Sequence, residues 1–140
     1  MIIVLDTNVV VSGILKPYSK AAALLRLVAG GEIQAAYDLR ILSEYRDVLR
    51  RPKFGFSRGE VEDFIVQMEK EGMLVTGSPL NFRLPDPEDE PFLEVALGAR
   101  ASAIVTGNKR HYPKKEYQGV KILSPAEFLE RKSSLHAPTG

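Results

Sequence analysis

The chain has 140 residues, of which 44% are hydrophobic and 26% are charged, and its formal net charge is +1. This length favours one globular domain with a core of its own, and the near-neutral balance means that any surface attracting nucleic acid must be local. The absence of cysteine excludes disulfides and thiolate metal sites.

No stretch of the sequence is apolar over the length that a membrane-spanning helix needs. The apolar start, Met1–Leu5, is too short for a signal peptide and carries no basic residues. We therefore expect a soluble cytoplasmic protein without a membrane partner.

The first stretch of the chain is a continuous apolar run, Ile2–Leu5, that leads directly into Asp6. Such a run predicts a strand that is buried on both faces, as in parallel sheets. Open α/β sheets bind their ligands at the carboxyl ends of their strands. We therefore expect Asp6 at the mouth of a binding site.

Helices and further strands alternate along the rest of the chain. The segment Val9–Tyr18, which contains Gly and Pro, is interpreted as irregular. Helices are expected over Lys20–Ala29, Leu39–Arg50, Ser57–Gly72 and Pro91–Arg100, and from Ser124 onward. Strands are expected over Ile33–Tyr37, Met73–Thr76, Ala103–Thr106 and Val120–Leu123. This alternation predicts a parallel sheet flanked by helices, in a three-layer α/β/α domain over residues 1–132 with a flexible tail over residues 133–140.

Several acids and one amide lie near predicted strand ends and helix starts. They are Asp6, Glu44, Asp86, Glu88, Asp89, Glu90 and Asn108. Carboxylates that are brought together repel one another and resist ionising together. A hard divalent cation such as Mg²⁺ or Mn²⁺ relieves this repulsion, lowers the pKa of a bound water and neutralises charge on a phosphate.

Each of these residues also has a purely structural interpretation. Asp6 and Asn108 are typical turn residues, and Asp89 is typical of a helix cap. Glu44 could be a surface charge paired with Arg40, four residues earlier. Only their combination indicates a metal site.

Four motifs in this chain resemble the PIN-domain family in their order and spacing. They are Val4–Val9, Ser43–Tyr45, Asp86–Ala96 and Ile104–Asn108. The resemblance extends from Met1 to about Leu129 and is closest to the prokaryotic branch of toxin–antitoxin ribonucleases. It implies a small parallel sheet with strand order 3-2-1-4-5 and an endoribonuclease that depends on Mg²⁺ or Mn²⁺.

The resemblance also implies roles for individual residues. Asp6, Glu44 and Asp89 match the three acids that are catalytic and bind metal. Supporting positions are Thr7, Asn8, Asp86 and Thr106, of which Asp86 is an alternative third acid. Asn108 stands where PIN domains commonly carry a fourth acid, and we expect its amide oxygen to bind the metal.

The amide of Asn108 leaves a second function open. Because an amide carries no charge, it predicts weaker binding of a second metal. A catalytically weakened PIN fold that binds RNA or a protein is therefore the alternative to an active nuclease. A phospho-acceptor domain is disfavoured, because Asp6 is followed by Thr7-Asn8 rather than a second acid.

The basic loop after Asn108 is the candidate RNA-binding segment. Its expected RNA contacts are Lys109, Arg110 and Lys114 to phosphates and Tyr112 or His111 to an unpaired base. The alternative is a solvated surface loop. RNA as substrate, a homodimer and an antitoxin protein as partner follow from the resemblance alone.

Overall fold

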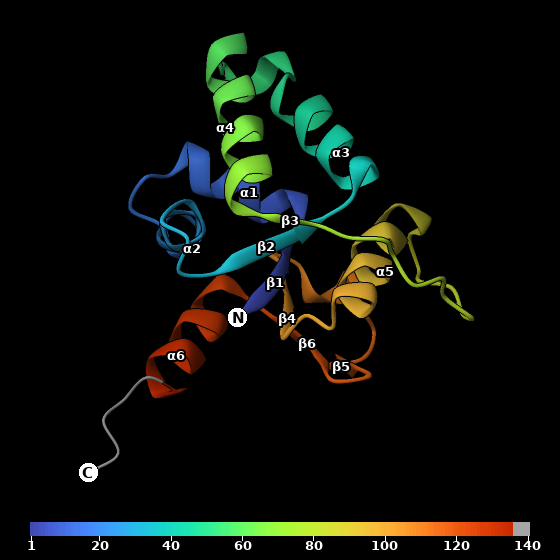
Figure 1. The fold of residues 1–140 in the computed structure, drawn as a ribbon. Helices are drawn as coiled ribbons and strands as arrows, with labels where there is room; N and C mark the ends of the chain where they lie inside the picture. The colour runs from blue at the N-terminus through green and yellow to red at the C-terminus, as the bar shows by residue number, and fades with distance from the viewer. Residues whose placement is uncertain (136–140) are drawn as a thin grey trace.

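A mostly parallel six-stranded sheet lies at the centre of the computed structural model, which describes residues 1–135 (Figure 1). Its strands are β1 (Ile2–Leu5), β2 (Gln34–Tyr37), β3 (Met73–Leu74), β4 (Ala103–Val105), β5 (Glu116–Tyr117) and β6 (Val120–Leu123). The strand order is β3-β2-β1-β4-β6-β5, and only the β5–β6 pair is antiparallel. The parallel strands alone follow the predicted order 3-2-1-4-5, and β5 is an additional edge strand that was not predicted.

Helices pack around this sheet and confirm the predicted three-layer α/β/α architecture (Figure 1). The α-helices are α1 (Thr7–Leu15), α2 (Lys20–Ala29), α3 (Leu39–Leu49), α4 (Arg58–Glu71), α5 (Glu90–Ala99) and α6 (Pro125–Leu135). Short 3-10 turns are η1 (Pro52–Phe54), η2 (Pro87–Asp89) and η3 (Lys109–His111). Helix α5 packs against β1, β2 and β4. Within residues 1–135, no helix combines the length and the apolar character needed to cross a membrane.

Helix α1 is the main element that the sequence pattern missed. The Gly and Pro residues of Val9–Tyr18 favour an irregular segment, and its consecutive β-branched residues also have low helix propensity. Tertiary packing overrides that propensity, since Val9 and Val10 are buried in the core. Gly13 has a packing role, because a Cβ at this position would lie 2.5 Å from the Leu25 side chain of α2.

The helix starts agree with the capping patterns in the sequence. The Ser57 hydroxyl accepts a hydrogen bond from the backbone N–H of Glu60 (3.1 Å) at the start of α4. Ser124 and Glu127 form a reciprocal capping box, with bonds of 3.1 and 2.9 Å, at the start of α6. Helix α6 extends to Leu135, so residues 133–135 are helical rather than part of a flexible tail. Residues 136–140 lie outside the described residues.

Candidate active site

The carboxyl ends of β1 and β4 place Asp6 and Thr106 side by side. The two strands pair in parallel, with Leu5 opposite Val105, so the residue after each strand emerges at the same sheet edge. The Thr106 hydroxyl donates to Asp6 Oδ2 (2.7 Å), and the Thr7 backbone N–H donates to Asp6 Oδ1 (3.0 Å). Asp6 is only 4% exposed. Both of its oxygens are therefore held in one orientation at the base of a cleft.

Asn8 supports this arrangement from the first turn of α1. Its Oδ1 accepts from the Gly107 backbone N–H (2.8 Å), and its Nδ2 lies 3.5 Å from Asp6 Oδ2. A Cβ on Gly107 would come within 3.1 Å of Asn8 Oδ1, so a side chain there would disturb the contact. Asn8 thus ties the segment after β4 to the start of α1.

Asp89 reaches the same cleft from the turn η2, just before α5. It is 7% exposed, yet its Oδ2 has no hydrogen-bond partner among the described residues. His111 Nδ1 lies 3.6 Å from this oxygen. Asp86 caps η2, and its Oδ1 accepts from the Glu88 backbone N–H (2.9 Å). The geometry therefore favours Asp89 over Asp86 as the third acid.

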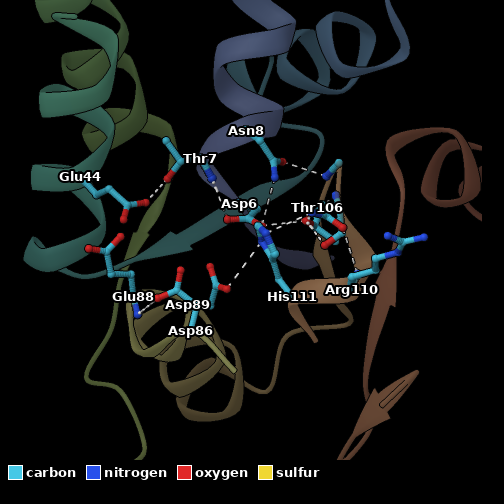
Figure 2. A network of polar contacts seen from close by, with 12 residues as sticks. Asp6, Thr7, Asn8, Glu44, Asp86, Glu88, Asp89, Thr106, Arg110 and His111 are labelled. Atoms are coloured by element: carbon cyan, nitrogen blue, oxygen red, sulfur yellow. Dashed lines mark hydrogen bonds and ion pairs between the residues drawn. The ribbon is translucent and has the colours of Figure 1, made fainter. Parts of the chain in front are cut away.

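Glu44 approaches the cleft from α3, beside Thr7 (Figure 2). The Thr7 hydroxyl donates to Glu44 Oε2, so the backbone N–H and the hydroxyl of Thr7 hold two different acids. Glu44 is half-buried. Glu44 therefore lines the same cleft as Asp6 and Asp89.

One group of possible metal ligands in the cleft consists of Asp6, Asp89 and His111. One oxygen from each acid and one ring nitrogen all lie within 4.8 Å of one another, and His111 Nδ1 is 3.9 Å from Asp6 Oδ2. We had interpreted His111 as a base-stacking residue of the basic loop. The signal that could have placed it is its position in a one-turn segment directly after the strand end that carries Thr106.

Asn108 occupies a different position from the one expected. Its Oδ1 accepts from the Arg110 backbone N–H (3.2 Å) and caps η3, while its Nδ2 lies 3.1 Å from His111 Nε2. The expectation that Asn108 itself binds the metal stays a prediction, and in this structure the cap and the imidazole engage its side chain.

Comparison with protein families now adds to this geometry. A family model described as PIN domain matches residues 2–110. The chain belongs to the PIN-domain family. A search of curated proteins found no match. The family consists generally of nucleases that use divalent metals, so the acidic cleft is the candidate active site of this PIN domain.

The acids of the PIN domain resist ionising together. Burial raises the pKa of Asp6 above its usual range, although the hydrogen bond from Thr106 opposes this effect. Burial, followed by the charge of Asp6, raises the pKa of Asp89 to about 6. Burial also raises the pKa of Glu44. Carboxylate oxygens that repel one another, one of them without a partner, fit a hard divalent cation.

The cleft has a volume of about 810 Å³, and its lining includes six acids together with basic side chains. Among the latter, the positive charge of Arg51 partly opposes the rise in the pKa of Glu44 that burial causes. Arg40 is held by Asp38 and Glu94 through ion pairs of 2.7 Å each. The cleft is large enough for a nucleotide, in the size range typical of ligand pockets.

Several side chains of the basic loop are engaged within the protein itself. Tyr112 is 2% exposed and packs in the core, so its ring cannot stack on an RNA base, and this expectation is corrected. Lys109 forms an ion pair with Glu127 (2.8 Å), and Lys114 lies over the Tyr117 ring at 5.9 Å. Arg110 is exposed and makes no ion pair within residues 1–135 (Figure 2).

Tyr45 fixes α3 to the strand end that carries Asp6. Its buried hydroxyl donates to the Leu5 carbonyl (2.5 Å). Leu5 directly precedes Asp6, and Tyr45 directly follows Glu44. We expect Tyr45→Phe to lower the free energy of unfolding by about 1–2 kcal/mol, because a buried carbonyl loses its partner. Urea unfolding measures this. Tyr18→Phe, at a fully exposed tyrosine, is the matched control and should leave stability unchanged; equal stability of both variants would contradict the role of Tyr45.

Proposed function

We propose that this PIN domain is a Mg²⁺- or Mn²⁺-dependent endoribonuclease in which Asp6 and Asp89 bind the metal and Glu44 completes the acidic site. The observation that supports it most directly is Asp89 Oδ2, a buried carboxylate oxygen that faces Asp6 without a partner among the described residues. An unpaired buried carboxylate is costly. A divalent cation would offset that cost and hold the two acids together.

The residues around the cleft have separable roles in this proposal. Thr106 and the Thr7 backbone N–H orient Asp6, while the Thr7 hydroxyl orients Glu44. A bound cation would supply a water of lowered pKa and neutralise charge on the scissile phosphate. Glu44, which lines the cleft, is positioned to accept a hydrogen bond from a water there.

RNA as the substrate is supported by the exposed basic side chains beside the cleft and by the resemblance to the prokaryotic toxin branch. Arg110 follows the strand end that carries Thr106 and points away from the acids (Figure 2). A side chain there would contact the backbone of a strand that leaves the cleft. The same resemblance supports the proposal that the protein is the toxin of a toxin–antitoxin pair, acts in the cytoplasm, forms a homodimer and binds an antitoxin.

The proposal is tested by cleavage of a single-stranded RNA with Mn²⁺ or Mg²⁺. We expect cleavage that EDTA stops and that Asp89→Asn reduces strongly. Asp63→Asn, at an exposed acid of α4, should cleave like the wild type. Cleavage that survives EDTA or Asp89→Asn would contradict the proposed site.

The arrangement around Asn108 favours one alternative function. Position 108 carries an amide, engaged by Arg110 and His111, in place of the fourth acid that PIN domains commonly carry. A PIN domain with weakened catalysis would bind RNA without cleaving it. Gel-shift and cleavage assays on one RNA distinguish the two functions: binding without cleavage in either metal favours the binding module.

Arg110 provides a test of the RNA path. We expect Arg110→Ala to raise KM for RNA about tenfold with little change in kcat, because a charge-assisted phosphate contact is lost. The difference should shrink as salt is raised. Lys70→Ala, at an exposed lysine of α4, is the matched control. An unchanged KM in Arg110→Ala would contradict the proposed contact between Arg110 and the RNA backbone.

A further inference from the structure

The metal centre of this PIN domain includes a histidine: we infer that His111 Nδ1 binds the same cation as Asp6 and Asp89. It rests on the proposed function, because it concerns the metal of that same site. It makes the centre a mixed nitrogen–oxygen site rather than one built from carboxylates alone.

Two unpartnered atoms that face each other are the basis of this inference. His111 Nδ1 and Asp89 Oδ2 are both buried, lie 3.6 Å apart and have no hydrogen-bond partner among the described residues. Asp6 Oδ2 lies 3.9 Å from the same nitrogen. These separations are longer than hydrogen bonds and suit atoms that converge on a shared cation. Asp89 is 7% exposed, so bulk water does not readily satisfy its free oxygen.

The position of Asn108 explains why a histidine takes this place. The amide caps η3 through the Arg110 backbone N–H, and this turn brings His111 back over the end of β4. The residue at the usual place of the fourth acid thereby positions a ligand three residues later. Asn108 is a positioning residue in this arrangement, and His111 is the ligand.

The ring proton of His111 must be placed for Nδ1 to bind a cation. Nδ1 then carries a lone pair and Nε2 carries the hydrogen, which needs an acceptor. The Asn108 amide, 3.1 Å from Nε2, can supply its oxygen by turning over, at the loss of its bond from the Arg110 N–H. A carboxylate at position 108 could accept from both groups, so we expect Asn108→Asp to bind metal more tightly.

A nitrogen ligand changes which cations the site prefers. Mg²⁺ is bound mainly by oxygen, whereas imidazole suits the first-row transition metals. The wild type should therefore prefer Mn²⁺ to Mg²⁺ more strongly than a variant with a third carboxylate. His111→Asp is the matched variant, because it keeps an anionic ligand but replaces nitrogen with oxygen.

Pulsed EPR of bound Mn²⁺, recorded without RNA, tests the inference directly. The chain has two histidines, His111 and His136, so protein without a histidine tag and with ¹⁵N-labelled histidine reports on these two rings alone. We expect imidazole-nitrogen coupling to Mn²⁺ in the wild type and in His136→Gln, and none in His111→Asp. Mn²⁺ titration should show binding at least about tenfold weaker in His111→Ala, the loss typical of even an indirect metal contact.

The outcomes separate this inference from the proposed function. Bound Mn²⁺ without nitrogen coupling, coupling that survives in His111→Asp, or no Mn²⁺ binding would each overturn the role of His111. RNA cleavage is measured separately on the same preparations. Coupling without cleavage would support the histidine ligand while contradicting the nuclease, and EDTA-sensitive cleavage without coupling would do the reverse.

Discussion

Asp6→Asn is expected to lower the rate of RNA cleavage at least about a hundredfold. A cation in such a site stabilises the charge of the transition state by several kcal/mol. Each 1.4 kcal/mol changes the reaction rate by a factor of ten. An amide oxygen brings no negative charge and binds the cation more weakly. Initial rates with saturating Mn²⁺ measure the effect, with Asp63→Asn as the control.

The same substitution should make the metal-free protein more stable. Asparagine is as good an N-cap as aspartate, and its oxygen can still accept from the Thr7 N–H. Its amide nitrogen can donate to the Thr106 hydroxyl, which can turn to the Asn108 carbonyl. Burial raises the pKa of Asp6, so at neutral pH its ionised form costs stability that the amide does not. Urea unfolding in EDTA should therefore give a higher midpoint for Asp6→Asn. A lower midpoint together with lost cleavage would mean that the activity was lost through damage to the fold.

Metal-free protein is expected to become more stable as the pH falls from 7 to 5, and Asp89→Asn should remove much of this gain. The folded-state pKa of Asp89, about 6, is above its ordinary value of 3.8. Between these two pH values the folded state therefore binds more protons than the unfolded state, and the free energy of unfolding falls as the pH rises toward and through 6. At one pKa unit per 1.4 kcal/mol, the full shift corresponds to about 3 kcal/mol, of which about half falls between pH 7 and 5.

Urea unfolding in EDTA at pH 5, 6 and 7 measures this slope. Asp63→Asn should retain the wild-type slope. Burial also raises the pKa values of Asp6 and Glu44, which gives a pH dependence of the same sign as that of Asp89. Part of the slope should therefore survive in Asp89→Asn. The depressed pKa of Glu127, about 2, acts only at lower pH and with the opposite sign. A wild type that loses stability between pH 7 and 5 would contradict the buried, unpaired state of Asp89.

Mn²⁺ should reverse this dependence. Metal binding requires deprotonated carboxylates, so its stabilisation is largest above pH 6 and fades as the acids take up protons. The rise in Tm on adding Mn²⁺ is therefore expected to be larger at pH 7 than at pH 5. An equal rise at both values would place the metal away from Asp89.

Much of the sheet and the position of Asp6 could be predicted, because both depend on local patterns. The apolar run before Asp6 indicated a buried parallel strand, and Ile3, Val4 and Leu5 are fully buried. Capping patterns located Ser57 and Ser124 at helix starts for the same reason. These patterns involve only a few neighbouring residues, so they can be recognised without knowledge of the rest of the fold.

The parts that escaped prediction depend on long-range packing. Val9 and Val10 disfavour a helix locally, and only their burial in the core explains α1. The same limit applies to Tyr112, whose place in a basic loop suggested a surface ring but whose side chain fills the core. His111 joins Asp6 and Asp89 only because β1 and β4 are neighbours and η3 turns back over their ends.

Anomalous diffraction from a crystal soaked with Mn²⁺ tests the central claim, that Asp6 and Asp89 share one divalent cation. We predict an anomalous peak between the two carboxylates, within coordination distance of both and in the cleft that Glu44 faces. A well-soaked crystal with Mn²⁺ only elsewhere on the protein, and none between these acids, would contradict the account.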